Sequence, residues 1–417
     1  HTEAWWLSLL TTAALAAAVW RSTPWRAARL GVAFGTGWLV AGTWWLFISL
    51  HVYGGLPAPL AVLAVLLLSV ALSLYLGVAM GVVAWCQTGR LLPDVAAFTG
   101  AWLLAELARG VIFTGFPWAA AGYAQVDGPL AALAPWVGVY GMGAVVALVG
   151  ALLAWPWVPS GLHGDAGAAA TASAPGAAPV SGPAPSLPAR NAPARWAAPV
   201  AALGLLILAP WARTDHTDSA GRVPVSLVQT AISQDEKFSV HDMPRALEWL
   251  VQALAQSRGQ LVVAPETAVP LLPADLPPEV WADLRASFEG TGRAALLGLP
   301  LGSFEEGYTN SVIGLGGPAP YRYDKHHLVP FGEFIPLGFR WFVDMMNIPL
   351  GDFNRGALGA PSFEALGQRW APNICYEDLF GEELARRFEH EARAPTVMVN
   401  VSNIAWFGDT IAIDQHL

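Results

Sequence analysis

"ALEWLVQALAQSRGQLVVAPE", residues Ala246–Glu266, changes its hydrophobic period halfway along. Its first half places Leu247, Leu250 and Leu254 at spacings of three and four, which is the period of a helix with one apolar face. Gln260–Glu266 is a short apolar run that ends on a carboxylate, which is typical of a buried strand. A helix followed at once by a strand predicts an α/β layered domain.

The same alternation continues on both sides of this stretch. Further β-type runs are Val223–Ile232 ("VPVSLVQTAI"), Ala294–Gly302 ("AALLGLPLG"), Tyr308–Gly316 ("YTNSVIGLG") and Thr396–Asn403 ("TVMVNVSN"). The α/β domain is therefore expected to occupy residues 222–417. Functional side chains in such sheets gather where strands end, which makes Glu266 a candidate.

The first 212 residues have a different composition. They contain 7 Arg and 5 acidic side chains, whereas the remaining 205 residues contain 41 charged side chains. Over the whole chain 13% of residues are charged and 54% are hydrophobic, against about 25% charged in an average soluble protein. A membrane α-helical bundle is therefore predicted for residues 1–212. The second half has a net charge of −11 and no basic cluster, which argues against nucleic-acid binding.

Six segments approach the roughly 20 apolar residues that a spanning helix needs. They are Ala4–Trp20, Leu30–Leu50, Pro57–Cys86, Val95–Phe113, Pro129–Trp157 and Trp196–Trp211. Arginines occur in the first, third and fifth connections and are absent from the second and fourth. Because cytoplasmic connections are enriched in Lys and Arg, this alternation places the odd connections in the cytoplasm and the α/β domain outside it.

Three features of the membrane half carry a specific expectation. Residues 159–195 are rich in Ala, Pro, Gly and Ser, and are expected to form a flexible cytoplasmic linker. Glu106 and Arg109 lie within the fourth apolar segment, where an ionisable pair is a functional candidate, but a helix-packing salt bridge explains it as well. Thr114–Trp118 ("TGFPW") is an interfacial anchor or a plain turn.

Three side chains in the α/β half have the chemistry of a covalent mechanism. Glu266 closes a strand, Lys325 is one of two lysines beside 20 arginines, and Cys375 is one of two cysteines. A thiolate nucleophile needs a base for its proton and a positive donor for the oxyanion of its tetrahedral intermediate. Glu, Lys and Cys can supply these roles, although a surface Glu, a surface Lys and a half-buried Cys account for the same residues.

Four motifs resemble those of the carbon–nitrogen hydrolase (nitrilase) superfamily. In chain order they are "VVAPETAVP", "YDKHHLVPFGEFIP", "NICYEDLFGEE" and "VSNIAWFG". Together with "GTWWLFISLHVYGGLPAPLA" and "LAELARGVIFTGFPWAAAGYAQVDGPLAALAP" in the membrane half, they resemble the apolipoprotein N-acyltransferase family over nearly the whole chain. The resemblance implies multi-pass helices followed by a nitrilase-like α-β-β-α sandwich. It also implies a bacterial inner (cytoplasmic) membrane location with the catalytic domain on the periplasmic side.

The resemblance further implies an acyl transfer from a membrane phospholipid, through a cysteine thioester, to the N-terminal amine of the diacylglyceryl-cysteine of an apolipoprotein. By motif position Cys375 is the nucleophile, Glu266 the general base and Lys325 the oxyanion stabiliser. The supporting positions are Glu333, Tyr376 and Glu377. No cofactor is implied, and a monomer is expected.

Two positions depart from the family pattern: Ile404 replaces a usual Asp, and Phe238 replaces a common Trp. The family also continues beyond Leu417 and begins one helix earlier, so the chain is expected to lack both ends. Residues 331–350 are apolar and aromatic, which suits a lid that dips into lipid, although core packing explains them equally. The expected lipid-binding residues are Phe238, Phe339, Trp341, Phe342 and Trp406.

Two other functions fit parts of the sequence. A membrane-anchored nitrilase-like amidase would use the same triad and release its acyl group to water, but six helices exceed what an anchor needs. A transporter or scaffold with an inert external domain would place polar residues in several helices, and here almost none occur apart from Glu106 and Arg109. His326 and His327 are adjacent and lack the i, i+4 spacing of a helical zinc site, so no metal is predicted.

Overall fold

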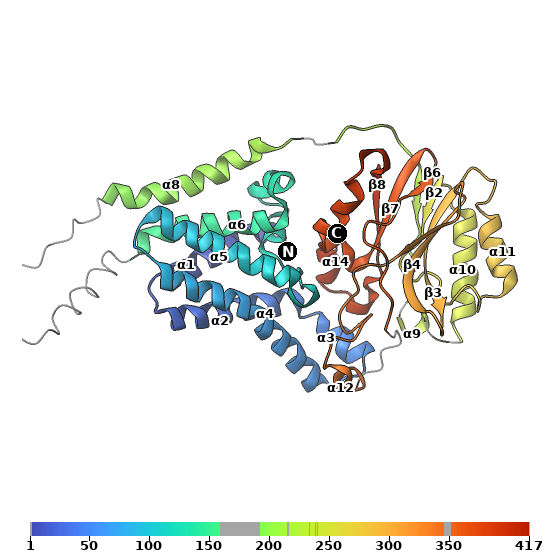
Figure 1. The fold of residues 1–417 in the computed structure, drawn as a ribbon, viewed down its shortest axis with the longest axis horizontal. Coiled ribbons are helices and arrows are strands. Elements are labelled where there is room, and N and C mark those ends of the chain that lie inside the picture. The colour runs from blue at the N-terminus through green and yellow to red at the C-terminus, as the bar shows by residue number, and fades with distance from the viewer. Residues whose placement is uncertain are drawn as a thin grey trace, which may run out of the picture. The chain divides into compact units, whose positions relative to one another are not determined.

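A computed structural model describes residues 2–158, 192–214, 217–232, 234–237, 239, 241–345 and 352–416. The chain divides into two compact units, whose elements are labelled in Figure 1. The first combines His1–Trp44 with Leu63–Asp218, and the second combines Trp45–Val62 with Ser219–Leu417. The short segment Trp45–Val62, which the sequence assigns to the membrane half, thus groups with the α/β domain. Most of the predicted linker, residues 159–191, lies outside the described residues.

Helices cover all six apolar segments of the sequence. They are α1 (Trp5–Val19), α2 (Pro24–Thr43), α4 (Ala58–Cys86), α5 (Leu91–Val111), α6 (Ala134–Ala154) and α8 (Ala192–Leu208). Within the described residues, three spans are long and apolar enough to cross a membrane: Ala58–Cys86, Leu91–Thr114 and Pro129–Trp157. Trp5–Val19 and Trp196–Ala212 are apolar but shorter.

The predicted segment Leu30–Leu50 is a broken helix. α2 ends at Thr43, and the chain bends by 65° into Leu46–Tyr53, which contains α3 (Leu46–Ile48) and the π-helix η2 (Ser49–Tyr53). The two pieces pass the test for a fourth span only when they are taken together. Trp45 at the bend is fully buried within the second unit. The apolar pattern missed this break because an indole packed on protein and one facing lipid look alike in a sequence.

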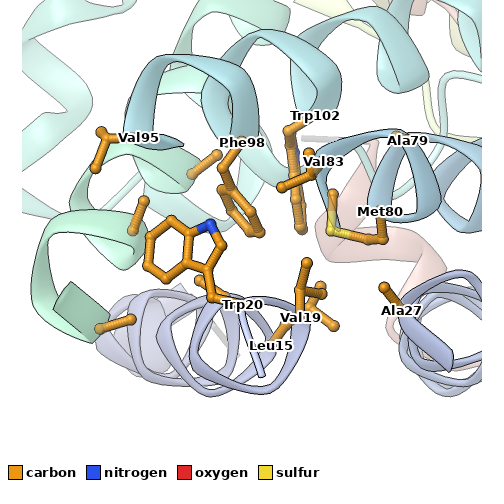
Figure 2. Packing of buried hydrophobic residues seen from close by; sticks show 14 of the residues in the cluster. Leu15, Val19, Trp20, Ala27, Ala79, Met80, Val83, Val95, Phe98 and Trp102 are labelled. Atoms are coloured by element: carbon orange, nitrogen blue, oxygen red, sulfur yellow. The ribbon is translucent and has the colours of Figure 1, made fainter. Parts of the chain in front are cut away.

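Large aromatic side chains fill the core of the first unit (Figure 2). Trp20 packs against Phe98, with ring centroids 5.9 Å apart, and edge-on against Trp155 at 5.7 Å. Glycines instead bring two helices together, because a Cβ at Gly31 or Gly35 of α2 would lie 2.8 Å from atoms of α4. Small residues four apart permit this close approach of helices in membranes.

The second unit contains a five-stranded sheet in the order β1-β2-β3-β4-β5. Its strands are β1 (Val225–Leu227), β2 (Leu261–Val263), β3 (Ala294–Ser303), β4 (Gly307–Leu315) and β5 (Tyr321–Asp324). β1, β2 and β3 are parallel to one another, β4 pairs antiparallel with β3, and β5 pairs antiparallel with β4. α10 (Met243–Gln256) and α11 (Pro278–Ala286) pack on this sheet. Leu247, Leu250 and Leu254 are all buried in that core, which confirms the helix–strand reading of the opening stretch.

A three-stranded sheet lies on the other side, away from α10 and α11 (Figure 1). It consists of β6 (Phe363–Ala365), β7 (Gln368–Ile374) and β8 (Val397–Val401), with β7 and β8 parallel. Gly314 of β4 allows close packing of the two sheets, because a Cβ there would lie 2.5 Å from the ring of Phe363. The predicted α/β layering is therefore confirmed, with two stacked sheets whose strand ends carry the candidate residues.

Candidate active site

Cys375 stands at the turn where strand β7 passes into the 3₁₀ segment η8 (Cys375–Leu379). Its φ of 52° lies in the left-handed region, which non-glycine residues rarely adopt. The preceding five residues of β7, Trp370–Ile374, are buried and fix the direction of approach. The turn therefore presents the cysteine at the carboxyl end of a rigid strand, where α/β folds place functional groups.

Glu377 ties the two sides of this turn together. Its Oε2 accepts hydrogen bonds from the main-chain N–H of Ile374 and from the Tyr323 hydroxyl, both at 2.7 Å. Its Oε1 accepts from the N–H groups of His326 and His327, at 2.7 and 3.1 Å. Four donors on one buried carboxylate hold the turn after β7 against the end of β5.

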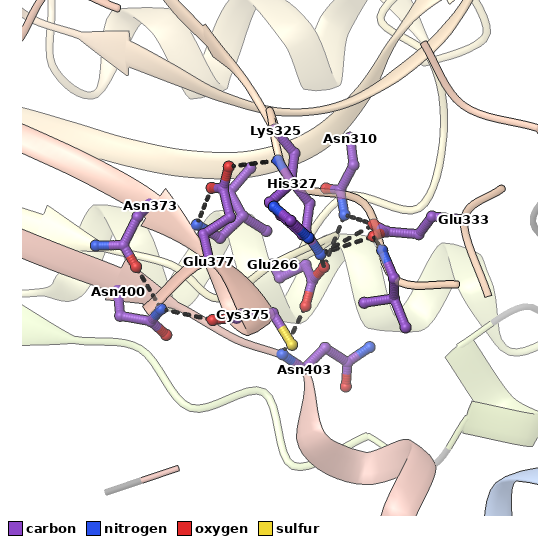
Figure 3. A network of polar contacts seen from close by, with 12 residues as sticks. Glu266, Asn310, Lys325, His327, Glu333, Asn373, Cys375, Glu377, Asn400 and Asn403 are labelled. Carbon is purple, nitrogen blue, oxygen red and sulfur yellow. Dashed lines mark hydrogen bonds and ion pairs between the residues drawn. The ribbon is translucent and has the colours of Figure 1, made fainter. Parts of the chain in front are cut away.

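A compact polar cluster contains the predicted base and ammonium (Figure 3). The Nζ atom of Lys325 lies 2.9 Å from Glu333 Oε2 and 3.4 Å from Glu266 Oε1. Asn310 Nδ2 donates to Oε1 of both carboxylates, each at 2.7 Å. The N–H of Asn403 donates to the second oxygen of Glu266 at 2.9 Å. The structure thus brings the predicted Glu, Lys and second Glu into direct contact.

The electrostatics of the cluster decide the resting state of the thiol. Burial raises the pKa of Cys375 to about 12, the Glu266 carboxylate acts in the same direction, and the Lys325 ammonium acts against both. Burial also disfavours the ammonium of Lys325, but Glu333 and Glu266 hold the pKa of this amine above its ordinary value. The resting site therefore holds a neutral thiol beside a charged amine. The sequence left open whether the nearby ammonium or the nearby carboxylates would dominate the pKa of this thiol. In the structure, burial and the carboxylates outweigh the ammonium.

Known proteins are similar in sequence to both the membrane half and the α/β half of this chain. A family model described as the apolipoprotein N-acyltransferase N-terminal domain matches residues 1–152. An apolipoprotein N-acyltransferase from Verminephrobacter eiseniae is 51% identical over 99% of this chain and 75% of its own length. The chain belongs to the apolipoprotein N-acyltransferase family. A second apolipoprotein N-acyltransferase, from Ralstonia nicotianae, is 43% identical over 99% of this chain and 74% of its own.

Among solved structures, a carbon–nitrogen hydrolase from Helicobacter pylori G27 covers 43% of this chain and 59% of its own. The two are 17% identical, with a TM-score of 0.29. The α/β assignment follows from the two sheets described above.

The other predicted site positions divide into a buried set and an exposed set. Tyr376 is fully buried, with its ring edge-on to His327 and Phe380. Phe339 and Trp341, at the start of α12 (Arg340–Val343), are 45% and 63% exposed. These two exposed rings match the lid interpretation better than core packing.

Phe342 and Trp406 instead contact the segment Trp45–Val62. Phe342 packs beside the fully buried Leu56 in a small apolar cluster. Trp406 accepts a hydrogen bond at its main-chain oxygen from Ser49 and stacks edge-on with Tyr53. For Phe342 core packing is therefore the better description. Phe238 lies outside the described residues, and Ile404 begins the short turn η11 (Ile404–Phe407).

Three asparagines of the site did not stand out in the sequence. Asn310 bridges the two carboxylates from β4, and the main-chain N–H of Asn403 holds Glu266. Asn400 of β8 contacts the carbonyl of Cys375. Each lies in or just after a β-type run that the sequence did identify. For Asn310 and Asn403, a polar residue at a buried or terminal position of such a run was the signal that could have found them, whereas Asn400, on the exposed side of β8, gave no such signal.

Glu106 and Arg109 form a separate buried pair in the first unit. The guanidinium of Arg109 donates to the main-chain oxygens of Phe116 and Trp118, both at 2.7 Å. Glu106 Oε1 accepts from the N–H of Ala121 at 2.7 Å. The pair therefore pins the loop after α5, including "TGFPW", which favours the packing interpretation of these charges and identifies that motif as a braced turn.

Proposed function

We propose that this chain moves an acyl group from a membrane phospholipid to Cys375, and from there to the N-terminal amine of a diacylglyceryl-cysteine on an apolipoprotein. The observation that carries the proposal is the buried thiol at the end of β7 together with the Glu266–Lys325–Glu333 cluster, in a chain with long apolar helices. Family membership supplies the substrate classes.

The residues support two displacements at one sulfur. In the first, Glu266 takes the thiol proton as the sulfur attacks the ester carbonyl, and the Lys325 ammonium stabilises the oxyanion. Collapse expels the lysophospholipid oxygen, which receives the proton from Glu266, and leaves a thioester on Cys375. In the second, the acceptor amine attacks the thioester, Glu266 takes the amine proton, and the sulfur leaves and recovers a proton. Glu333 and Asn310 hold the Lys325 ammonium and the Glu266 carboxylate in place.

We place the α/β unit on the periplasmic side of the inner membrane. The first, third and fifth connections carry arginines, as expected for the cytoplasmic side of a membrane. The second connection carries no Lys or Arg, and its segment Trp45–Val62 belongs to the α/β unit. This grouping supports the proposal that both lie on the same side of the membrane, opposite the arginines.

A fusion experiment tests this orientation. A reporter that is active only outside the cytoplasm should be active after Arg213 and inactive within residues 159–195. The reverse pattern would overturn the orientation without affecting the chemistry.

The chemistry is tested by incubating the protein with phospholipid labelled in its acyl chain and measuring intact mass. A thioester adduct should form, should survive in Cys86→Ala, and should be absent in Cys375→Ala. Addition of a diacylglyceryl-cysteine peptide should then discharge the label onto the peptide amine. Release of free fatty acid with no labelled peptide would instead indicate the amidase-type hydrolase.

A further inference from the structure

An asparagine pair joins the two parallel strands beside the candidate nucleophile. Asn373 of β7 and Asn400 of β8 are register partners. Asn400 Nδ2 donates to Asn373 Oδ1 at 2.5 Å and to the main-chain oxygen of Cys375 at 3.0 Å (Figure 3). Both partners are acceptors, so the amide nitrogen of Asn400 must face them.

The hydrogen bond from Asn400 ends on the main chain of Cys375, whose backbone conformation is unfavourable by itself. Cys375 has its φ at 52°, and a non-glycine residue in this region persists only when its surroundings over-determine it. Glu377 supplies one restraint, by accepting the N–H of Ile374 just before the cysteine. Asn400 supplies the other, on the carbonyl just after it. The two restraints come from different elements and enclose the strained residue.

We propose that Asn400 is a positioning residue that fixes the peptide between Cys375 and Tyr376 for acyl transfer, an inference that rests on the proposed function of Cys375. A trans peptide is planar, so a hydrogen bond on its carbonyl also fixes the direction of the N–H on its other side. When this peptide plane is fixed, the direction of the Cys375 side chain is fixed as well. The Tyr376 N–H then also has a fixed direction relative to a bound acyl carbonyl.

The proposal separates two reactions of the same thiol. Acyl transfer passes through a tetrahedral oxyanion and depends on the orientation of this peptide. Alkylation by iodoacetamide is a direct displacement at sulfur and forms no oxyanion. Asn400→Ala in the intact protein should therefore slow thioester formation by about 10-fold to 10²-fold, the size of effect expected from small misplacements. Its alkylation rate, measured in a Cys86→Ala background, should stay close to that of the parent.

The matched control is Asn354→Ala. Asn354 also donates from its side-chain amide to a main-chain oxygen, that of Glu306 in the turn between β3 and β4, at 2.8 Å. This variant should leave both reactions unchanged. Asn400 lies on the exposed side of β8, so its truncation opens no buried cavity. Equal losses of acylation and alkylation, or no loss of either, would overturn the proposal.

Asn400→Asp gives a second, size-matched test. An ionised carboxylate cannot donate to the Cys375 carbonyl, whereas a protonated one can. The acylation rate of this variant relative to the parent should therefore rise as the pH is lowered, and a pH-independent ratio would contradict the positioning role. If Cys375→Ala still forms the adduct, the proposed function itself fails. If that variant is inactive while Asn400→Ala and Asn400→Asp behave like the parent, only the role of Asn400 fails.

Discussion

Each unit of the molecule buries oppositely charged side chains, and the two groups are built differently. In the first unit, the guanidinium of Arg109 lies 3.9 Å from Glu106 Oε1, and both side chains have short bonds to the main chain of one loop. In the second unit, Lys325 lies between two carboxylates, and its described side-chain bonds go to Glu266 and Glu333.

This difference separates a structural role from a chemical one. The bonds of Glu106 and Arg109 hold one loop in place, so these charges contribute stability. Glu266 and Lys325 also have electrostatic interactions with the Cys375 thiol, so they can exchange a proton with it or stabilise a new anion. Burial of an ionisable group does not by itself mark a catalytic site. The presence of a reactive group beside it decides the role.

The largest expected effect is that of Glu266→Gln, and the same substitution at Glu106 is its control. Glu266→Gln should lower acyl transfer by about 10²–10⁴-fold, because the proton acceptor is lost. Its alkylation by iodoacetamide should become faster, because Glu266 helps to raise the pKa of Cys375 and its removal favours the thiolate. Since that pKa is about 12 in the parent, the parent alkylation rate should climb about tenfold per pH unit between pH 8 and pH 10.

Glu106→Gln is the matched control for this prediction. It should leave both acyl transfer and alkylation nearly unchanged, because Glu106 contacts a loop of the other unit. Comparable loss of acyl transfer in the two variants would remove the distinction between the charge groups.

The next effect concerns the ammonium. Lys325→Met keeps the side-chain length but removes the donor for both tetrahedral intermediates. Acylation and deacylation should each slow by about 10²–10³-fold in single-turnover measurements.

Lys237→Met tests whether any nearby ammonium would serve. Lys237 is also buried, but it donates to the main-chain oxygen of Glu266 at 3.3 Å, and the structure gives it no ion pair with either carboxylate. It should cost less activity than Lys325→Met. Losses of equal size would show that net charge in the region matters, and that no specific oxyanion donor exists.

A smaller effect, on stability alone, is expected in the first unit. Arg109→Met leaves the carbonyls of Phe116 and Trp118 without their donor, so the free energy of unfolding should fall by about 2–4 kcal/mol. The measurement is thermal unfolding in detergent, with acyl transfer scored per folded molecule. Arg90→Met, at an exposed position before α5, should change neither. A drop in activity per folded molecule as large as that of Lys325→Met would give this pair a catalytic role.

The smallest effect concerns the apolar surface of the α/β unit. Trp341→Ser should weaken the use of phospholipid by roughly tenfold or less, since a ring that enters lipid only in part contributes about 1 kcal/mol. It should spare short soluble esters and thermal stability. Phe342→Ser should lower the unfolding temperature, because this ring packs beside Leu56. Identical behaviour of the two variants would mean that residues 339–342 do not divide into a lipid-facing and a packed side.

Much of the fold could be predicted from the spacing and length of apolar residues. The exceptions all involve contacts between segments that are distant in sequence. The period of three and four predicted α10, the length of the apolar segments predicted the membrane helices, and short apolar runs predicted the strands. Periods describe how one segment buries its own face. They failed at Trp44–Trp45, where a helix breaks so that Trp45 is buried within the α/β unit. They also gave no sign that Phe342 and Val343 join the small cluster around Leu56, from which they are separated by about 290 residues in sequence.

The sequence by itself determined which chemistry was available, since a rare cysteine, a rare lysine and a strand-ending glutamate can be named from one chain. Tertiary structure decided what those groups do to one another. It set the Lys325 amine between two carboxylates, buried Cys375 so that the thiol stays protonated at rest, and recruited Asn310, Asn400 and the N–H of Asn403 from distant strands. The reason is physical: a pKa and a hydrogen bond depend on distances of a few ångströms, and those distances exist only after the strands pair.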